Sequence, residues 1–311
     1  MNLTLPLDAS QTAARLPWLA LVRELHALLL DDSVQVPPRL VQALGGGASL
    51  FVMPALDSRL AITKLITFTP ANAGSERATI QGDVLVFDIA TGQRRLVLDG
   101  PAVTARRTAA VSALAAQRLA PQTQGPMLIV GAGVQGKSHL EAFATVLGVR
   151  EFRIASRSAH SVQALVAHAQ SLGLNARAVT DADAALADCP LVVTCTPASG
   201  IVLRSAPRDN AFVCAVGAFT PSMVELGPDL CRHLAETGKV FIDTADARHE
   251  GGDLLQAGLD VHGFATLADI VRHDLSTPSG PVLFKSCGWA GWDLAAARVA
   301  ADTSAAANIN R

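Results

Sequence analysis

The sequence predicts an α/β protein with two domains, and three observations support this prediction. The chain has 311 residues, half of them hydrophobic and 17% charged, which is enough for a sizeable core and for more than one domain. From about residue 127, short apolar runs alternate with helical patterns, as in the βαβ units of a mostly parallel sheet. The first hundred residues instead favour an α+β domain, because Gly, Asp and Asn separate their apolar runs.

The N-terminal part begins with a predicted helix over residues 16–31. Its later apolar runs are expected to form an antiparallel sheet. The runs "VLVFDIA" and "RRLVLDG" flank the turn "TGQ" and have the alternation of a β-hairpin. An alanine-rich helix over residues 102–120, ended by Pro121, joins the two parts, and its composition suits a buried helix.

The C-terminal part is predicted to alternate strands with helices. Its apolar runs are short and rich in β-branched residues, which is typical of strands buried on both faces of a parallel sheet. The runs expected as strands are, in chain order, "MLIV", "FRIAS", "ARAV", "LVVTC", "AFVCAV" and "KVFID", and helices are expected over residues 134–147, 159–172 and 181–187.

The first of these strands runs into the turn "GAGVQG" and then into a helix. Gly131 permits the tight turn, Gly133 lets phosphates approach closely, and Gly136 lets the helix pack on the strand. Free backbone N–H groups and the positive end of the helix dipole favour a pyrophosphate here, and we assign Val134 and Gln135 to the same site. A G-x-G-x-x-G turn can be merely structural, but between strand and helix it predicts a Rossmann dinucleotide-binding domain.

The end of the second strand bears on which dinucleotide binds. NAD sites place an acidic residue there, about 20 residues after the glycines, to bind the ribose 2′-hydroxyl. This chain has Ser156, Arg157 and Ser158 instead, which can bind a 2′-phosphate through charge-assisted hydrogen bonds. NADP(H) is therefore favoured and NAD(H) stays possible; the alternative is that Arg157 is an ordinary exposed arginine.

Three cations of the N-terminal part are candidates for substrate binding: Arg39 in "VPPRL", Lys64 in "LAITKLITF" and Arg107 in "TARRTAA". Lys64 lies inside an apolar run, where an ammonium is not buried without an anionic partner. The carboxylate of a substrate would serve. The alternative for each is a surface cation or a structural ion pair. We expect the neighbouring Arg106 to be solvated.

Several function classes are disfavoured. A net charge of −2 with interspersed acids and bases predicts neither a nucleic-acid nor a membrane partner. The first ten residues lack the features of a signal peptide and no long apolar segment follows, so we expect a cytoplasmic protein. The absence of tyrosine excludes a phenol as proton donor. The five scattered cysteines are expected to be buried thiols, His139 and His249 to be structural, and no metal site is expected.

Several long segments carry a resemblance: "VPPR", "AITKLITFTPAN", "TGQRRLVLDGPAVTARRTAAVSALAAQRLA", "LIVGAGVQGKSHLEAF", "VGAFTPSMVELGPDL", "HEGGDLLQAG" and "SGPVLFKSCGWAGWDLAAA". In order and spacing they resemble the ornithine cyclodeaminase/mu-crystallin family over nearly the whole chain. The resemblance implies a substrate-binding and dimerisation domain over residues 1–120, completed by residues 290–311, and a Rossmann NAD(P)-binding domain over residues 121–289. It also implies a homodimer formed through the sheet of the substrate domain.

The same resemblance implies roles for single residues. The family positions that match Arg39, Lys64 and Arg107 hold the carboxylate of a small amino or imino acid beside the nicotinamide. Thr196 and Pro197 match a turn near the nicotinamide, although their role can equally be structural. Met53, Phe219 and Glu225 are assigned to the substrate pocket, with the same alternative for Glu225.

Phe219 helps to place the chain within the family. True ornithine cyclodeaminases have an aspartate at this position, which handles the side-chain amine, and a phenyl ring can neither take a proton nor pair with an ammonium. The resemblance is therefore to the branch that reduces the C=N bond of Δ1-pyrroline-2-carboxylate or Δ1-piperideine-2-carboxylate with NAD(P)H. The alternatives are an ornithine cyclodeaminase, a small amino-acid dehydrogenase and, less favoured, a non-enzymatic binding protein.

Overall fold

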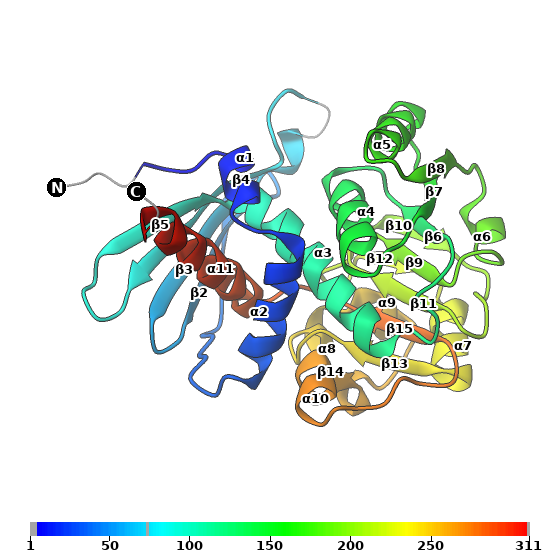
Figure 1. Cartoon of the computed structure of the whole chain (residues 1–311). Helices are drawn as coiled ribbons and strands as arrows, with labels where there is room; N and C mark the ends of the chain where they lie inside the picture. The colour runs from blue at the N-terminus through cyan, green and yellow to red at the C-terminus, as the bar shows by residue number, and fades with distance from the viewer. Residues whose placement is uncertain (1–4, 73–74, 310–311) are drawn as a thin grey trace. The chain divides into compact units, whose positions relative to one another are not determined.

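The structure is a computed structural model that describes residues 5–72 and 75–309 (Figure 1). Residues 1–4, part of the N-terminal segment that is not expected to be a signal peptide, lie outside the described residues. By contacts the chain divides into two compact units, residues 1–107 with 289–311 and residues 108–288. The limits predicted from the sequence assign all of helix α3 (Gly100–Leu119) to the N-terminal part, whereas the contacts divide this helix after Arg107.

The first unit is built on a five-stranded antiparallel sheet whose strands follow one another in chain order. The predicted hairpin is present as its last two strands. Two N-terminal helices are α1 (Ala9–Ala14) and α2 (Trp18–Leu30); α1 was not predicted, although Asp8 and Gln11 form a capping box at its start. The strands are β1 (Leu40–Gly45), β2 (Ala48–Leu56), β3 (Leu60–Phe68), β4 (Ile80–Asp88) and β5 (Arg94–Asp99), with a 3-10 turn η1 (Pro70–Asn72) after β3.

The last helix, α11 (Ala290–Ile309), completes this unit from the other end of the chain. It packs on β2, β3 and β4 and against α2, as Figure 1 shows in red and blue. The helix is rich in alanine, and Leu294 to Ala297 are wholly buried. Small side chains let the helix lie close to the sheet, so apolar contact is the general force that holds it there.

Arg298 adds an ionic anchor to the same helix. Its side chain is almost buried, and it bonds three carboxylates, Nε to Asp57 at 2.5 Å, Nη1 to Glu24 at 3.0 Å and Nη2 to Asp31 at 2.5 Å. These carboxylates lie on the β2–β3 turn, on α2 and at the end of α2. A guanidinium this deep needs such counter-charges, so Arg298 joins α11 to both neighbours at once.

The second unit contains an eight-stranded parallel sheet with the order β14-β13-β15-β11-β9-β6-β7-β8. The alternation read from the sequence is confirmed, and the four-residue central strands are buried along their whole length. A separate parallel pair, β10 (Ser199–Leu203) and β12 (Val224–Leu226), was not predicted. The sheet strands are β6 (Met127–Val130), β7 (Glu151–Ala155), β8 (Asn175–Ala178), β9 (Leu191–Thr194), β11 (Phe212–Ala215), β13 (Lys239–Ile242), β14 (Ala265–Thr266) and β15 (Val282–Lys285).

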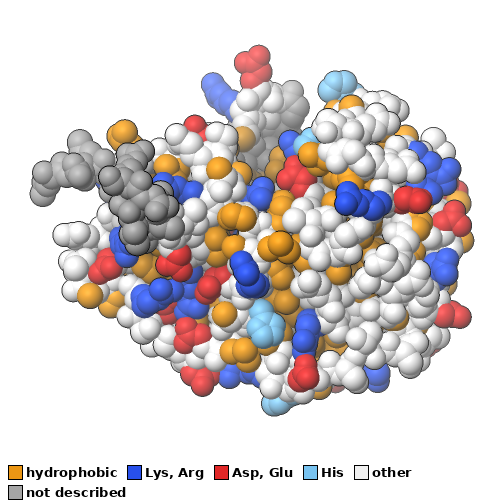
Figure 2. All heavy atoms as spheres, in the orientation of Figure 1, with side chains coloured by type: hydrophobic (Ala, Val, Ile, Leu, Met, Phe, Trp, Pro, Cys, Tyr) orange, Lys and Arg blue, Asp and Glu red, His pale blue; other side chains and the backbone are white. Residues whose placement is uncertain are grey.

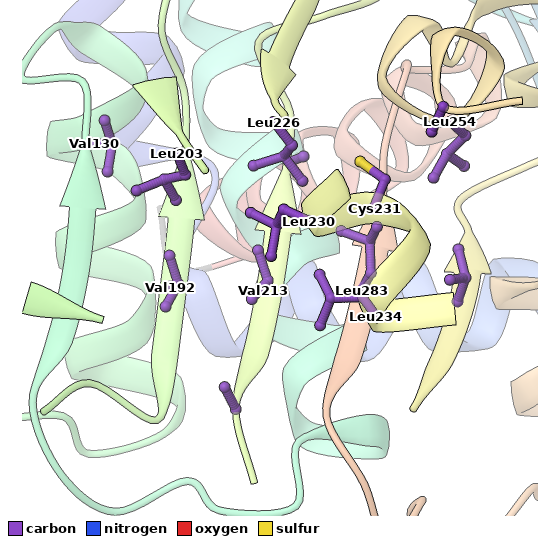
Figure 3. Packing of buried hydrophobic residues seen from close by; sticks show 14 of the residues in the cluster. Val130, Val192, Leu203, Val213, Leu226, Leu230, Cys231, Leu234, Leu254 and Leu283 are labelled. Carbon is purple, nitrogen blue, oxygen red and sulfur yellow. The ribbon is translucent and has the colours of Figure 1, made fainter. Parts of the chain in front are cut away.

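Helices follow most of these strands and cover the sheet. The core between them is apolar. Figure 3 shows Val213 and Leu283 of the strands beside Leu230 and Leu234 of α7 (Pro228–Thr237), with Val130 and Val192 farther along the sheet near Leu203. The predicted fold class, an α/β protein with a Rossmann domain and an α+β domain, is confirmed. The helices are α4 (Val134–Val146), α5 (Ala159–Ser171), α6 (Ala182–Ala185), α7 (Pro228–Thr237), α8 (Ala247–Glu250), α9 (Gly252–Gln256) and α10 (Leu267–Arg272), with a 3-10 turn η2 (Val261–Gly263).

The strand order fixes where a ligand can bind on this unit. From β6 the chain moves outward to β7 and β8, and it then returns to β9 on the other side of β6. The order therefore reverses between β6 and β9. In open α/β sheets, ligands bind in the crevice at the carboxyl ends of the strands at such a switch point, which here lies between the glycine turn and Cys195.

The distribution of surface charges and the lengths of the helices agree with the expectations from the composition. Figure 2 shows Lys and Arg side chains interspersed with Asp and Glu over one face, as expected for a chain of net charge −2. Within the described part of the chain, no helix is long and apolar enough to cross a membrane.

Candidate active site

The glycine turn after β6 has the geometry that a bound pyrophosphate requires. Gly131 has φ +121°, and a Cβ there would lie 2.6 Å from the carbonyl oxygen of Cys195. A Cβ on Gly136 would lie 2.0 Å from the carbonyl oxygen of Gly131. A Cβ on Gly133 would meet nothing within 4 Å, so this glycine leaves open space in front of the turn. Two glycines are thus needed by the fold, and the third leaves room for a ligand.

The start of α4 faces the same space. Gly133 is its N-cap and makes no side-chain cap, and Val134, the first residue of the helix, is 70% exposed. Gln135 is half-buried, and its backbone carbonyl accepts a hydrogen bond from His139. The N-terminal end of α4, with its N–H groups and positive dipole end, is therefore accessible to an anion.

The predicted 2′-phosphate residues lie at the carboxyl end of the adjacent strand, β7. Ser156, Arg157 and Ser158 are all exposed. The Ser158 hydroxyl caps α5, because it accepts from the N–H of Ser161 at 3.2 Å. Ser156 and Arg157 are thus the better candidates for direct contact with a phosphate.

Glu225 organises the loops on the other side of the switch point. Its Oε1 accepts from both the N–H and the hydroxyl of Thr196, at 2.7 and 2.8 Å. Its Oε2 accepts from the hydroxyl of Thr194 at 2.9 Å and from the N–H of Gly217 at 2.7 Å. The sequence predicts Glu225 for the substrate pocket, but in the structure the residue is wholly buried and its oxygens hold the loops after β9 and β11. Burial raises the pKa of this carboxyl.

A buried ion pair between Asp253 and Lys285 holds the backbone at Glu225, and it was not predicted from the sequence. Asp253 Oδ1 accepts from the N–H groups of Glu225 and Leu226, at 2.6 and 2.9 Å. Asp253 Oδ2 lies 2.9 Å from Lys285 Nζ, and neither side chain is exposed. Burial acts to lower the pKa of Lys285, but Asp253 and other nearby anionic groups outweigh it and the pKa is raised. A charged residue inside the apolar run "PVLFKS" was the available signal.

His139 lies behind the glycine turn as a buried structural group, as expected. Its Nδ1 bonds the carbonyl of Gln135 at 2.8 Å, and its Nε2 lies 2.9 Å from the hydroxyl of Ser112 on α3. Because a carbonyl can only accept, Nδ1 carries the ring proton and Nε2 is the acceptor. Burial lowers the pKa of His139 to about 4, so the ring is neutral at neutral pH.

The predicted cations Lys64 and Arg107 of the first unit meet at a single carboxylate. Lys64 Nζ lies 2.8 Å from Oδ2 of Asp293, and Arg107 Nε donates to Oδ1 of Asp293 at 3.2 Å. All three residues are buried, with 1% exposure for Lys64 and none for Asp293. The sequence left the partner of Lys64 to an incoming substrate, whereas the structure supplies it from the first turn of α11.

Burial lowers the pKa of Lys64 to about 8. Arg107 and the half-buried Arg39 act in the same direction, and Asp293 acts against them. Met53 is paired with Lys64 across β2 and β3 and is buried beside it. The first unit therefore brings together all four residues that the sequence predicts for it.

The expectation for Arg106 was wrong, because its guanidinium stacks 3.9 Å from the ring centroid of Trp18 and donates to the carbonyl of Leu16.

The other predicted residues lie in the second unit. Phe219 follows β11, is half-buried and packs against the hydrophobic core. Pro197 is exposed beside Thr196.

All five cysteines are buried, and burial raises the pKa of each thiol. Among the described residues no group of His, Cys, Asp and Glu could hold a metal ion.

A doubly wound parallel sheet with an open glycine turn at its switch point defines a Rossmann-type α/β protein. The chain belongs to the ornithine cyclodeaminase/mu-crystallin family, whose model matches residues 19–308. The resemblance noted in the sequence is thereby confirmed.

Its similarities to individual proteins extend over nearly full lengths. The chain is 40% identical over 300 residues to Delta(1)-pyrroline-2-carboxylate reductase 2 of Burkholderia ambifaria, covering 95% of this chain and 94% of that one. It is 39% identical to Delta(1)-pyrroline-2-carboxylate/Delta(1)-piperideine-2-carboxylate reductase of Azospirillum brasilense, covering 96% of each. The solved structure of Thermococcus litoralis Delta(1)-pyrroline-2-carboxylate reductase with NADH and L-proline has the same fold, with a TM-score of 0.83 at 21% identity and coverage of 97% and 95%.

The buried neutral ring of His139 predicts a loss of stability in mild acid. An unfolded histidine takes a proton near pH 6.5, whereas the folded ring does so only near pH 4. The contribution of this group to the free energy of unfolding is therefore fully present above about pH 6.5. It is lost as the pH falls toward 4, by on the order of 3 kcal/mol. Urea unfolding at several pH values should show this loss in the parent and a smaller one in His139→Gln. The exposed His160→Gln serves as control, and parallel acid profiles for parent and H139Q would contradict the assignment.

Proposed function

We propose that the protein is an NAD(P)H-dependent reductase of cyclic ketimine carboxylates, converting Δ1-pyrroline-2-carboxylate or Δ1-piperideine-2-carboxylate to proline or pipecolate. The observation that carries the proposal is the similarity, about 40% over nearly the full length, to relatives named for this reaction. The chain's own residues support it at the cofactor turn, at the buried cations and at Phe219.

The cofactor would be held by the second unit. The open space before Gly133 and the accessible start of α4 fit a pyrophosphate. Arg157 and Ser156 would bind a 2′-phosphate, which supports NADPH over NADH, because no carboxylate stands there to repel it. When bound, the nicotinamide supplies the hydride.

The substrate carboxylate would be held by Lys64, Arg107 and Arg39. Lys64 and Arg107 bring two positive charges to the single negative charge of Asp293. The buried cluster thus keeps one positive charge in excess, which one carboxylate neutralises. Holding both reactants in attack geometry can supply up to about 7–11 kcal/mol of the barrier.

Reduction of the imine also needs a proton on nitrogen, unless the substrate arrives as an iminium. Lys64, with a pKa of about 8, is largely an ammonium at neutral pH and is a suitable donor, directly or through water. Phe219 offers no base for the side-chain amine of ornithine, so the cyclising deamination has no group to drive it at that position.

The first prediction for this function concerns the reaction. The protein should oxidise NADPH in the presence of either cyclic ketimine, should be much slower with pyruvate plus ammonia, and should release no ammonia from ornithine. Phe219→Asp should slow ketimine reduction, because it replaces an apolar contact with a charge. NADPH absorbance and an ammonia assay measure these outcomes, and efficient conversion of ornithine to proline by the parent would refute the proposal in favour of a cyclodeaminase.

A second prediction concerns the cofactor. Arg157→Asp should weaken NADPH binding by roughly ten- to a hundredfold, since a charge-assisted hydrogen bond of ~1.5–3 kcal/mol is lost, and should affect NADH far less. Arg150→Asp makes the same charge change in the exposed residue just before β7, at the other end of the strand, and should leave both affinities unchanged. Fluorescence titration gives the dissociation constants. Equal affinity of the parent for NADPH and NADH would rule out the preference.

We also propose a homodimer formed through the sheet of the first unit. Lys64 faces Asp293 of α11, so its neighbour Leu65 lies on the opposite face of β3. Leu65 is in register with Val52 on β2, which in turn is in register with Leu40 on β1. Leu40 and Leu65 are 57% and 41% exposed, an apolar surface that a second copy would cover.

The dimer prediction is tested by mass in solution. Sedimentation should show a dimer for the parent and a monomer with unchanged circular dichroism for the double variant Leu40→Lys and Leu65→Lys. Leu172→Lys, at an exposed leucine of the second unit, should remain a dimer. A monomeric parent at micromolar concentration would exclude the proposal.

A further inference from the structure

We infer that Asp293 is a positioning residue of the proposed ketimine reduction, which keeps Lys64 charged as the proton donor and holds Arg107 in the orientation that receives the substrate carboxylate. The inference rests on the proposed function and extends it to a residue of the last helix. No sequence signal had singled out Asp293, although it is a lone acid in the apolar run "GWDLAAA".

The geometry gives each oxygen of Asp293 its own cation. Oδ2 takes Lys64 Nζ at 2.8 Å, and Oδ1 takes Arg107 Nε at 3.2 Å. The bond engages only Nε of the guanidinium, so its fork of terminal amino groups can take a second, bidentate carboxylate. Asp293 therefore orients Arg107 without occupying the atoms best suited to the substrate.

The charge balance explains why Lys64 depends on this carboxylate. The charged groups that face its ammonium are Asp293 from α11, Arg107 from α3 and Arg39 from the segment before β1. Burial and both arginines lower the pKa of Lys64, to about 8, and Asp293 is the group that opposes them. Without it the pKa would fall further, and a larger share of Lys64 would be a neutral amine, with no proton to give, at neutral pH.

The proton balance of the reaction fits this role. A bound reduced nicotinamide would supply the hydride for the new C–H bond. The π electrons of the C=N bond would then become a lone pair on nitrogen, which would take a proton from the Lys64 ammonium. The amine left on Lys64 then regains a proton from water. Each turnover thus restores the charge pair with Asp293.

A purely structural role is the competing explanation, and the surroundings of Asp293 weigh against it. The helix is already fixed by its buried alanines and by Arg298, which bonds three carboxylates on neighbouring elements. Burying three charges to secure a helix that is anchored in these ways costs desolvation energy without need. The retention of Asp293 next to the two proposed substrate-binding cations is explained by the reaction.

The test is the pH profile of kcat/KM for ketimine reduction with NADPH. In the parent, an alkaline limb near pH 8 should report Lys64. Asp293→Asn keeps the shape and removes the charge, so the limb should move down by about one unit or more. The value of kcat/KM should then fall about twofold or more at pH 7 and about tenfold or more at pH 9. The dissociation constant of NADPH should be unchanged. Asp302→Asn, an exposed acid of the same helix, is the matched control and should leave the profile unchanged.

The outcomes separate the two proposals. An inactive parent would count against the reductase function itself. An active parent with an unmoved limb in D293N, or an equal loss at every pH, would overturn the role of Asp293. Should D293N fail to fold, Asp293→Glu carries the test, because it keeps the charge but misplaces it: the limb should stay near pH 8 while kcat falls, and a limb shifted to lower pH would overturn the inference.

Discussion

The carboxylate of Asp293 joins three segments that are far apart in the sequence, because Lys64 on β3 and Arg107 on α3 both pair with it from α11. A buried charge without a partner is too costly to keep, so this one requirement fixes how the last helix meets the sheet. Arg298, one turn further along α11, meets the same requirement with its three carboxylates. The helix therefore has a defined position, and not only an apolar contact, on the sheet.

In the second unit, buried charges that need partners hold backbone groups in place. Asp253, paired with Lys285, holds the N–H groups of Glu225 and Leu226, and Glu225 in turn holds the loops after β9 and β11. These loops begin at the carboxyl ends of β9, which borders the point where the strand order reverses, and of its neighbour β11. The glycine turn after β6 needs almost no side chains, since glycine and helix N–H groups form it. The first unit thus orders charged side chains around a buried carboxylate, and the second orders backbone groups.

Local patterns carried most of what could be predicted. Apolar alternation and the strand-turn-helix order depend on neighbours in the chain, so the parallel sheet, the hairpin and the glycine turn were readable before the structure. Ion-pair partners could not be predicted from the sequence, because Lys64 and Asp293 meet only once the chain has folded. A lone charge in an apolar run signals that a partner exists without saying which one. Lys64, Lys285 and Asp293 all carried that signal, and only Lys64 was interpreted from it. The short pair β10 and β12 lacks the length and period that a sequence pattern needs.

The interrupted order of the first unit also has a consequence for synthesis. Its sheet is made first, the whole second unit follows, and α11 emerges last. Until then one face of β2 to β4 is uncovered, and Lys64 has no Asp293 to pair with. At roughly 5–20 residues per second, the ribosome needs on the order of 10 to 40 seconds to translate the intervening unit. During that interval the nascent protein must keep an open apolar sheet from aggregating until α11 is made.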